Sequence, residues 1–167
     1  MAITIKNIDR LVDKLNNLAD VDVEKYVRKA TTFVHAQAKL LAPVDNGHLK
    51  GSIHMKVDKE KNKVTGRVYT NVNYAPFVEF GTGIRGNGSY PYANELDFPL
   101  VYKDKPWRVA FESTKGDTKG KKIVVYTKGQ KAQPFMYPAL KGAEKYVERL
   151  IQNGVQSEID KIAGGGK

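Results

Sequence analysis

The sequence predicts an α+β fold, with helices toward both ends of the chain and strands between them. Apolar residues recur at every third or fourth position before residue 41 and again after residue 138. Between these regions, apolar and polar residues alternate over 53–70 and over 107–125. Because 167 residues are typical of one domain, we expect a single α+β domain over 1–162 and a flexible tail over 163–167.

Two helices are expected at the N-terminal end. The first covers residues 7–19, where Asn7 offers a cap and apolar side chains share one face. The second runs from Asp22 to Leu41, because its apolar residues advance by three or four positions at each step. Pro43 ends this helix.

The middle of the chain predicts about four antiparallel strands. Alternation over 53–57 and 64–70, joined by the charged linker 59–63, indicates one hairpin. Alternation over 107–111 and 123–125, joined by the Lys- and Gly-rich segment 115–122, indicates a second one.

Irregular segments separate these elements. Asn46 and Gly47 predict a tight turn before the first strand begins. The segment from Gly81 to Lys105 shows neither the helical nor the strand periodicity of apolar residues, so we expect a long loop there. The final helix follows Pro138 and keeps one apolar face through residue 162, although Gly154 weakens it.

Composition excludes several classes of chemistry. The formal net charge is +10 and the pI is about 9.6, which suits anionic partners without specifying one. The chain has no cysteine, so disulfides, thiolate zinc sites and cysteine nucleophiles are excluded. We see neither a signal peptide nor an apolar run of membrane-spanning length, and we expect a soluble intracellular protein.

Two motifs could suggest ligand sites, and both are better explained otherwise. Gly81, Gly83 and Gly86 satisfy the dinucleotide-binding spacing GxGxxG, but no helix is expected to open at the third glycine. The three histidines, which are His35, His48 and His54, lack the paired spacing of a helical metal site. We therefore expect no cofactor and no metal ion.

Two acidic residues, Glu79 and Asp45, are candidates for a chemical or a structural role. Glu79 lies among apolar neighbours in YAPFVEFGTG, residues 74–83, which predicts a partly buried carboxylate. A structural ion pair or helix cap is favoured over a catalytic base, because no nucleophile or second carboxylate accompanies Glu79. Asp45 is interpreted as a turn residue whose carboxylate accepts backbone hydrogen bonds. We expect no enzymatic activity.

Basic residues and tyrosines interleave over 103–108 and 115–131. This arrangement is compatible with phosphate contacts, and equally with a solvated hairpin whose lysines protect the sheet edge. The second interpretation is favoured, because no known DNA-reading motif is present. The lysines of the longer stretch are Lys115, Lys119, Lys121, Lys122, Lys128 and Lys131.

Three separated signatures are informative together. They are APVDNGHLKGSI at 42–53, NYAPFVEFGTG at 73–83 and KGQKAQPFMYPAL at 128–140. In this order and spacing they resemble the HK97-like tail-component family of tailed bacteriophages. The resemblance implies an interface or structural role for the signature residues: Pro43, Asp45, Gly47, Leu49, Ser52, Tyr74, Val78, Glu79, Gly81, Thr82, Gln133, Pro134, Phe135, Pro138 and Ala139.

The same resemblance implies a structural virion protein without enzymatic activity. Such a protein would be assembled in the host cytoplasm and would act as a head-tail connector, that is, a neck, tail-completion or tail-terminator subunit. It would form a ring, with a hexamer favoured, at the head-tail junction or the proximal tail. Its implied partners are further copies of itself, a head-closure or connector protein and the tail tube protein. DNA passing through the lumen would make non-specific contacts, and no membrane would be involved.

Two alternative functions stay open at this point. One is a basic nucleic-acid-binding module without sequence preference, which the net charge would support. The other is a small hydrolase built around Glu79 and a histidine, which requires a proximity that the sequence does not show.

Overall fold

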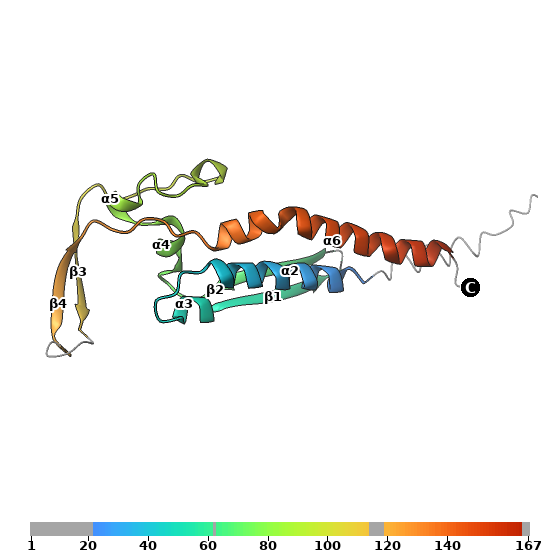
Figure 1. Cartoon of the computed structure of the whole chain (residues 1–167), viewed down its shortest axis with the longest axis horizontal. Coiled ribbons are helices and arrows are strands. Elements are labelled where there is room, and N and C mark those ends of the chain that lie inside the picture. The colour runs from blue at the N-terminus through green and yellow to red at the C-terminus, as the bar shows by residue number, and fades with distance from the viewer. Residues whose placement is uncertain (1–21, 62, 114–118, 165–167) are drawn as a thin grey trace, which may run out of the picture. The chain divides into compact units, whose positions relative to one another are not determined.

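The computed structural model describes residues 22–61, 63–113 and 119–164 (Figure 1). It confirms an α+β fold. Backbone contacts divide the chain into two compact units. Unit 1 comprises the chain up to Gln37, His54–Tyr69 and the chain from Ala139, and unit 2 comprises Ala38–Ile53 and Thr70–Pro138. The helix predicted over 7–19 lies outside the described residues, and the single domain over 1–162 stays a prediction.

Helix α2, Val23–Leu41, confirms the helix predicted from Asp22 to Leu41. It begins where the Asp22 carboxylate accepts a hydrogen bond from the Glu24 amide at 3.1 Å, which satisfies one of the free N–H groups of the first turn. It ends just ahead of Pro43, because a proline disfavours helical geometry in the residue before it.

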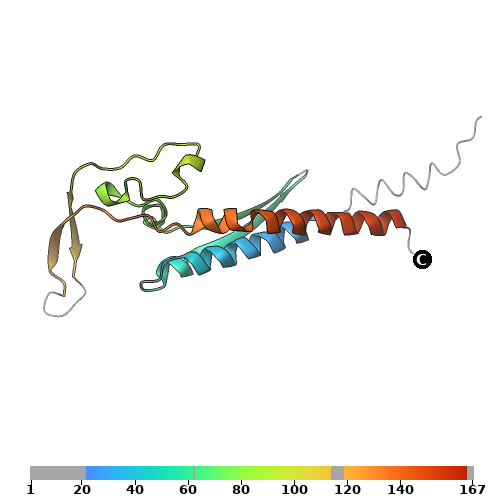
Figure 2. The same ribbon diagram turned by 45° about the horizontal axis from the view of Figure 1, so that its top comes forward.

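The first hairpin consists of β1, Ile53–Glu60, and β2, Lys63–Thr70, which pair antiparallel as predicted. Within unit 1 it lies along α2 in both Figure 1 and Figure 2. A Cβ atom at Gly66 would overlap the Thr31 hydroxyl, so the missing side chain allows strand and helix to approach closely.

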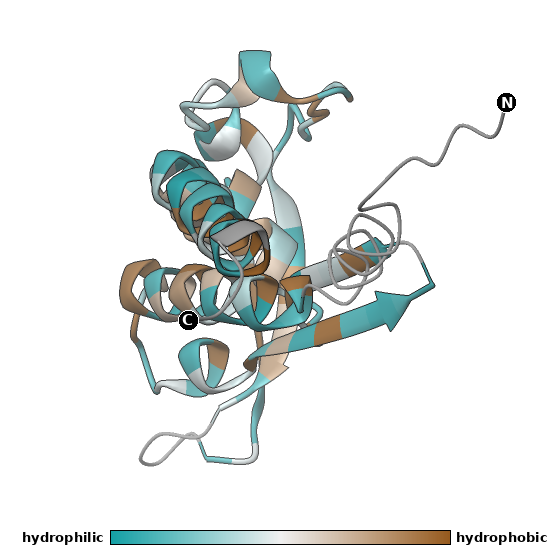
Figure 3. Cartoon of the chain, turned by 90° about the vertical axis from the view of Figure 1, so that its right-hand side faces the viewer, coloured by the Kyte–Doolittle hydropathy of each residue, from teal (hydrophilic) through white to brown (hydrophobic). Residues whose placement is uncertain are grey.

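Helix α6, Met136–Gly164, begins two residues before Pro138 and runs alongside α2 in both views (Figures 1 and 2). The rings of Phe33 and Tyr146 lie 4.3 Å apart between the two helices. A side chain at Gly154 would overlap the ring of Tyr26, so this glycine permits the close packing of the helices. Figure 3 shows hydrophilic residues on the side of α6 that faces away from α2.

A polar cluster also joins α2 to α6. The Glu158 carboxylate accepts hydrogen bonds from Lys25 Nζ at 2.6 Å and from the Tyr26 hydroxyl at 2.9 Å. Lys161 Nζ lies 3.3 Å from the same carboxylate. The hydrogen bonds from Lys25, Tyr26 and Lys161 lower the pKa of Glu158 from 4.5 to about 2.

This shifted pKa predicts acid sensitivity with a defined window. Because the folded-state pKa is the lower one, the stabilisation by Glu158 is complete above pH 4.5 and is lost as the pH falls toward about 2. The melting-temperature difference between wild type and Glu158→Gln should therefore be constant above pH 4.5 and shrink below it. Glu148→Gln, at an exposed glutamate of the same helix, serves as the control. A difference that does not change between pH 5 and 2 would contradict the assignment.

The second hairpin, in unit 2, corrects the prediction of one four-stranded sheet. Strands β3, Trp107–Glu112, and β4, Lys122–Thr127, pair antiparallel with Trp107 opposite Thr127 and Glu112 opposite Lys122. Each hairpin forms its own two-stranded sheet. Alternation predicted the strands correctly but not the number of sheets, because it specifies side-chain direction and not which strand edges pair.

Short helices in unit 2 were missing from the prediction, and two of them correct the loop expected over 81–105. The Asn46-Gly47 turn leads into α3, His48–Gly51, before the strand begins. Helix α4, Ala75–Phe80, was not predicted. The expected loop of 81–105 contains α5, Gly83–Gly86, and a 3₁₀ turn, Ala93–Glu95. All are too short to show helical periodicity in the sequence.

The interior of unit 2 gathers residues from all three sequence signatures. Phe135 and Ile53 are the largest fully buried side chains, at 1% and 0% exposure. Leu49, Ala75 and Tyr90 are also buried. Among the described residues, no helix combines the length and apolar character needed to cross a membrane.

Candidate functional site

Glu79 joins the second signature to the third. It lies in α4, is 5% exposed, and accepts three backbone hydrogen bonds at the start of α6. The amides of Phe135 and Met136 donate to Oε2 at 2.7 and 2.9 Å, and the amide of Tyr137 donates to Oε1 at 3.1 Å. The carboxylate therefore has the contacts of a helix cap supplied from a distant segment, in agreement with the structural interpretation made from the sequence.

The local sequence explains why a carboxylate is needed there. The first turn of a helix has N–H groups without partners inside the helix, and its dipole favours a negative charge. Pro134 fixes the backbone that enters α6, and Pro138 within the first turn has no N–H to satisfy. One glutamate therefore accepts hydrogen bonds from the three free N–H groups between these two prolines.

A tyrosine is buried beside this cap. Tyr90 is 4% exposed, and its hydroxyl makes no hydrogen bond within the described part of the chain. Burial first, and the negative charge of Glu79 second, raise the pKa of Tyr90 above its usual value of 10. Tyr90 was not among the predicted site residues, since nothing in the sequence distinguishes it from the neighbouring tyrosines.

The glycines of the GxGxxG spacing, Gly81, Gly83 and Gly86, allow neighbouring segments to pack closely against the backbone. Thr82 forms an isolated antiparallel bridge with Gln130, so the second signature also contacts the third there. Gly81 has φ 79°, and a Cβ atom on it would lie 2.7 Å from the Ala132 amide nitrogen. Gly86 ends α5 instead of opening a helix, in agreement with the argument against a dinucleotide site.

A groove in unit 2 collects residues of all three signatures, and we name it the signature groove. Its volume is about 480 Å³. The His48 ring nitrogen Nδ1 lies 3.1 Å from the Tyr74 hydroxyl, and Gln130 Nε2 donates to the Phe77 carbonyl at 2.9 Å. The lining residues are Pro43, Val44, Asp45, Asn46, Gly47, Leu49, Tyr74, Val78, Gln130 and Gln133.

Seven of these ten lining residues were predicted as signature residues, and Val44, Asn46 and Gln130 were not. Val44 and Gln130 occupy signature segments at positions for which the resemblance implied no role. Gly47 adopts φ 79°, as the turn prediction requires, and its turn brings Leu49 into the interior. Asp45 is the only charged residue among those that line the groove.

The other predicted residues lie in different surroundings. The hydroxyl groups of Ser52 and Thr70 form a hydrogen bond at 2.7 Å, next to the first residue of β1 and at the last residue of β2. Pro134 and Phe135 lead into α6, and Pro138 and Ala139 lie within it, with Ala139 buried. The structure therefore brings together most of the signature residues that lie in unit 2.

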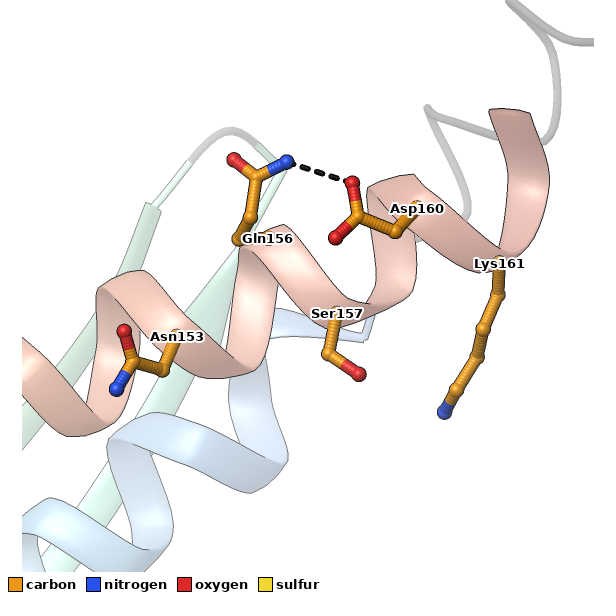
Figure 4. A pocket seen from close by; sticks show the side chains of 5 residues that line it. All are labelled: Asn153, Gln156, Ser157, Asp160 and Lys161. Carbon is orange, nitrogen blue, oxygen red and sulfur yellow. Dashed lines mark hydrogen bonds between the residues drawn. The ribbon is translucent and has the colours of Figure 1, made fainter. Parts of the chain in front are cut away.

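The remaining candidates form no site. Among the described residues, no group of three His, Cys, Asp or Glu side chains could hold a metal ion. A polar hollow on α6 is lined by five side chains of that one helix, of which Gln156 donates to Asp160 at 2.8 Å (Figure 4). Ser157 and Lys161 point to the other side of the helix in Figure 4, so these groups do not converge on a ligand.

Comparison with known proteins supports the resemblance. Residues 5–81 match the family described as "Bacteriophage HK97-gp10, putative tail-component". The match includes the first signature and most of the second, and it ends before the third. No curated protein and no solved structure matches the chain significantly. The resemblance predicted from the signatures is therefore confirmed over residues 5–81, a segment that matches a family described as a phage tail component.

Proposed function

From the HK97-gp10-like tail-component segment of this chain, we propose that the protein is a ring-forming head-tail connector. In this role it is a neck, tail-completion or tail-terminator subunit at the head-tail junction. Its partners are further copies, a head-closure or connector protein and the tail tube protein, and a hexamer matches a tail tube of that symmetry. The protein acts as a structural part and not as an enzyme.

One observation carries this proposal: unit 2 exposes many large apolar side chains. Phe77, Val101 and Tyr126 are 56%, 89% and 68% exposed, and both strands of the second hairpin contribute further examples. Strand β4 exposes three consecutive large side chains, Val124, Val125 and Tyr126, and a large exposed apolar surface is typical of a protein interface. A two-stranded hairpin also has little stability alone in water and gains it by packing against other elements.

The arrangement around Glu79 supports a structural role over the hydrolase alternative. Both carboxylate oxygens accept backbone hydrogen bonds at the start of α6. A general base requires an oxygen that can reach the proton it removes.

Self-association of the purified chain tests the proposal. We expect light scattering to give a mass of several subunits at micromolar concentration, and negative-stain electron microscopy to show closed rings with a central opening. A protein that stays monomeric at high concentration, together with its absence from virions and tails, would overturn the proposal.

The basic nucleic-acid-binding module stays a second candidate, because charge is concentrated in one segment. Residues 103–131 contain nine Lys and Arg and three Asp and Glu, a net charge of +6 within the +10 of the chain. If the free chain binds duplex DNA by phosphate contacts, its affinity will fall steeply with salt concentration. Weak binding at moderate salt by a chain that still forms rings would favour the connector.

A further inference from the structure

The start of α6 leaves one acceptor site of the Glu79 carboxylate free. A carboxylate offers about four lone-pair sites, shared equally between its two oxygens. The amides of Phe135 and Met136 occupy both sites of Oε2, and the amide of Tyr137 occupies one site of Oε1. Because Glu79 is 5% exposed, water has little access to the remaining site of Oε1. A buried acceptor in this position favours a further donor from the chain itself.

Tyr90 is a buried donor that lacks an acceptor. Its side chain is 4% exposed, and its hydroxyl makes no hydrogen bond within residues 22–61, 63–113 and 119–164. A buried tyrosine hydroxyl usually has a partner, because it has given up its hydrogen bonds to water. The free donor of Tyr90 and the free acceptor of Glu79 are therefore complementary.

Ring contacts connect Tyr90 to both segments that form the cap. The ring of Tyr90 meets that of Phe80, the neighbour of Glu79 in α4, edge-on at 5.1 Å. Tyr92 lies 5.7 Å from the Tyr90 ring and 5.1 Å from the Tyr137 ring. Burial first, and the charge of Glu79 second, raise the pKa of Tyr90, so the hydroxyl lies within electrostatic reach of the carboxylate. Their present geometry falls short of a hydrogen bond.

The backbone on both sides of Tyr90 is fastened to the same part of unit 2. Ser89 Oγ accepts a hydrogen bond from the Ala132 amide at 2.8 Å, in the third signature. The Tyr102 hydroxyl donates to the Phe80 carbonyl at 2.9 Å, at the end of α4. These contacts keep the ring beside the cap, so a small shift of the hydroxyl is enough to bring it to Oε1 of Glu79.

We propose that the Tyr90 hydroxyl donates a hydrogen bond to the free site of Glu79 Oε1 and is the fourth donor of the cap. Tyr90 is then a positioning residue, because it orients the carboxylate toward the amides of α6. It also ties the segment 81–105 to the start of that helix. A hydrogen bond to a charged acceptor is stronger than one between neutral groups. The contact is independent of the proposed ring, so the failure of one leaves the other standing.

The variant Tyr90→Phe distinguishes a bonded hydroxyl from an unpartnered one. Removing an unpartnered buried hydroxyl leaves stability unchanged or raises it, whereas removing a donor to a buried carboxylate lowers it. We expect Tyr90→Phe to raise the equilibrium constant of unfolding about tenfold or more, which is the usual contribution of a hydrogen bond to a charged group. Urea unfolding of the full-length chain, at the same protein concentration as wild type, provides the measurement. A variant as stable as wild type, or more stable, would overturn the proposal.

The matched control is Tyr92→Phe, at a half-buried tyrosine in ring contact with Tyr90. It removes a hydroxyl from the same aromatic cluster and should change the unfolding constant about threefold or less. Equal losses in the Tyr90 and Tyr92 variants would overturn the specific role of Tyr90.

The Glu79→Ala background tests whether the Tyr90 hydroxyl acts through this carboxylate. Two side chains in contact have non-additive effects, so Tyr90→Phe should change the unfolding constant of Glu79→Ala about threefold or less. A tyrosine that acts only through the packing of its ring would show the same effect in both backgrounds. Equal effects of Tyr90→Phe with and without Glu79 would therefore overturn the proposal.

Hydrogen exchange measures the cap without requiring the double variant to fold. The amides of Phe135, Met136 and Tyr137 are the donors that Glu79 holds, and their exchange reports how often the cap opens. We expect these amides to exchange about tenfold faster in Tyr90→Phe than in Tyr92→Phe, in proportion to the lost hydrogen bond. Equal exchange of the three amides in both variants would show that Tyr90 does not position the cap.

Discussion

Glu79→Ala is expected to lower the free energy of unfolding by about 3–5 kcal/mol, because three backbone N–H groups lose their acceptor and each buried loss costs about 1–3 kcal/mol. The expected loss is smaller than the sum of three fully buried losses, because the amides of Met136 and Tyr137 are only partly buried and can form hydrogen bonds to water instead. Glu79→Gln should cost roughly half as much, because one amide oxygen still accepts while its NH₂ faces donors. Urea unfolding followed by circular dichroism measures both changes.

The control for this prediction is Glu144→Ala, at an exposed glutamate of α6. A surface substitution of this kind changes the free energy of unfolding by about 0.5 kcal/mol or less. If Glu79→Ala were as stable as Glu144→Ala, the cap would not hold α6 in solution. If Glu79→Gln folded and assembled normally but abolished turnover of a small molecule, a chemical role for the carboxylate would have to be considered.

Phe135→Ala is expected to cost about 3–5 kcal/mol, because it leaves a large cavity beneath the entry to α6. Phe135 is 1% exposed and lies between the Glu79 cap and the rigid Pro134. A loss of this size is comparable to a large part of the stability of an ordinary domain, so ring formation should fail together with folding. Thermal and urea unfolding of the variant provide the measurement.

Phe98→Ala is the matched control for Phe135→Ala. Phe98 is 48% exposed and contacts the ring of Phe80 edge-on at 6.1 Å. Its replacement should cost about 1.5 kcal/mol or less, because most of its surface is already in water. Comparable losses in the two variants would show that Phe135 does not anchor the interior of unit 2.

The helices and hairpins were predictable because their side-chain periods are long enough to recognise. The helix ending at Leu41 and both hairpins matched the prediction closely, and α6 began only two residues before Pro138. The short helix α4 was missed, although Pro76 near its start is a usual helix signal, because six residues do not complete two turns. Alternation likewise could not distinguish one sheet from two, since it contains no information on strand edges.

In the candidate site, too, local features were predictable from the sequence and contacts between distant segments were not. The sequence predicted that Glu79 is a partly buried carboxylate and favoured an ion pair or a helix cap for it, because its neighbours are apolar and no nucleophile or second carboxylate accompanies it. It did not identify the three amides that Glu79 binds, which lie 56 to 58 positions away. Gln130 was missed for a similar reason, since its place in the groove depends on the bridge to Thr82.

The sequence by itself determined the α+β class and the residues that carry the three signatures, and it predicted the family that residues 5–81 match. It could do so because periodicity and motif spacing are local properties of the chain. Only the tertiary structure decided that the three signatures meet in one groove, that Glu79 caps α6 and that large side chains of the second hairpin stay exposed. These facts depend on contacts between segments far apart in the sequence, which are selected by the free energy of packing the whole chain.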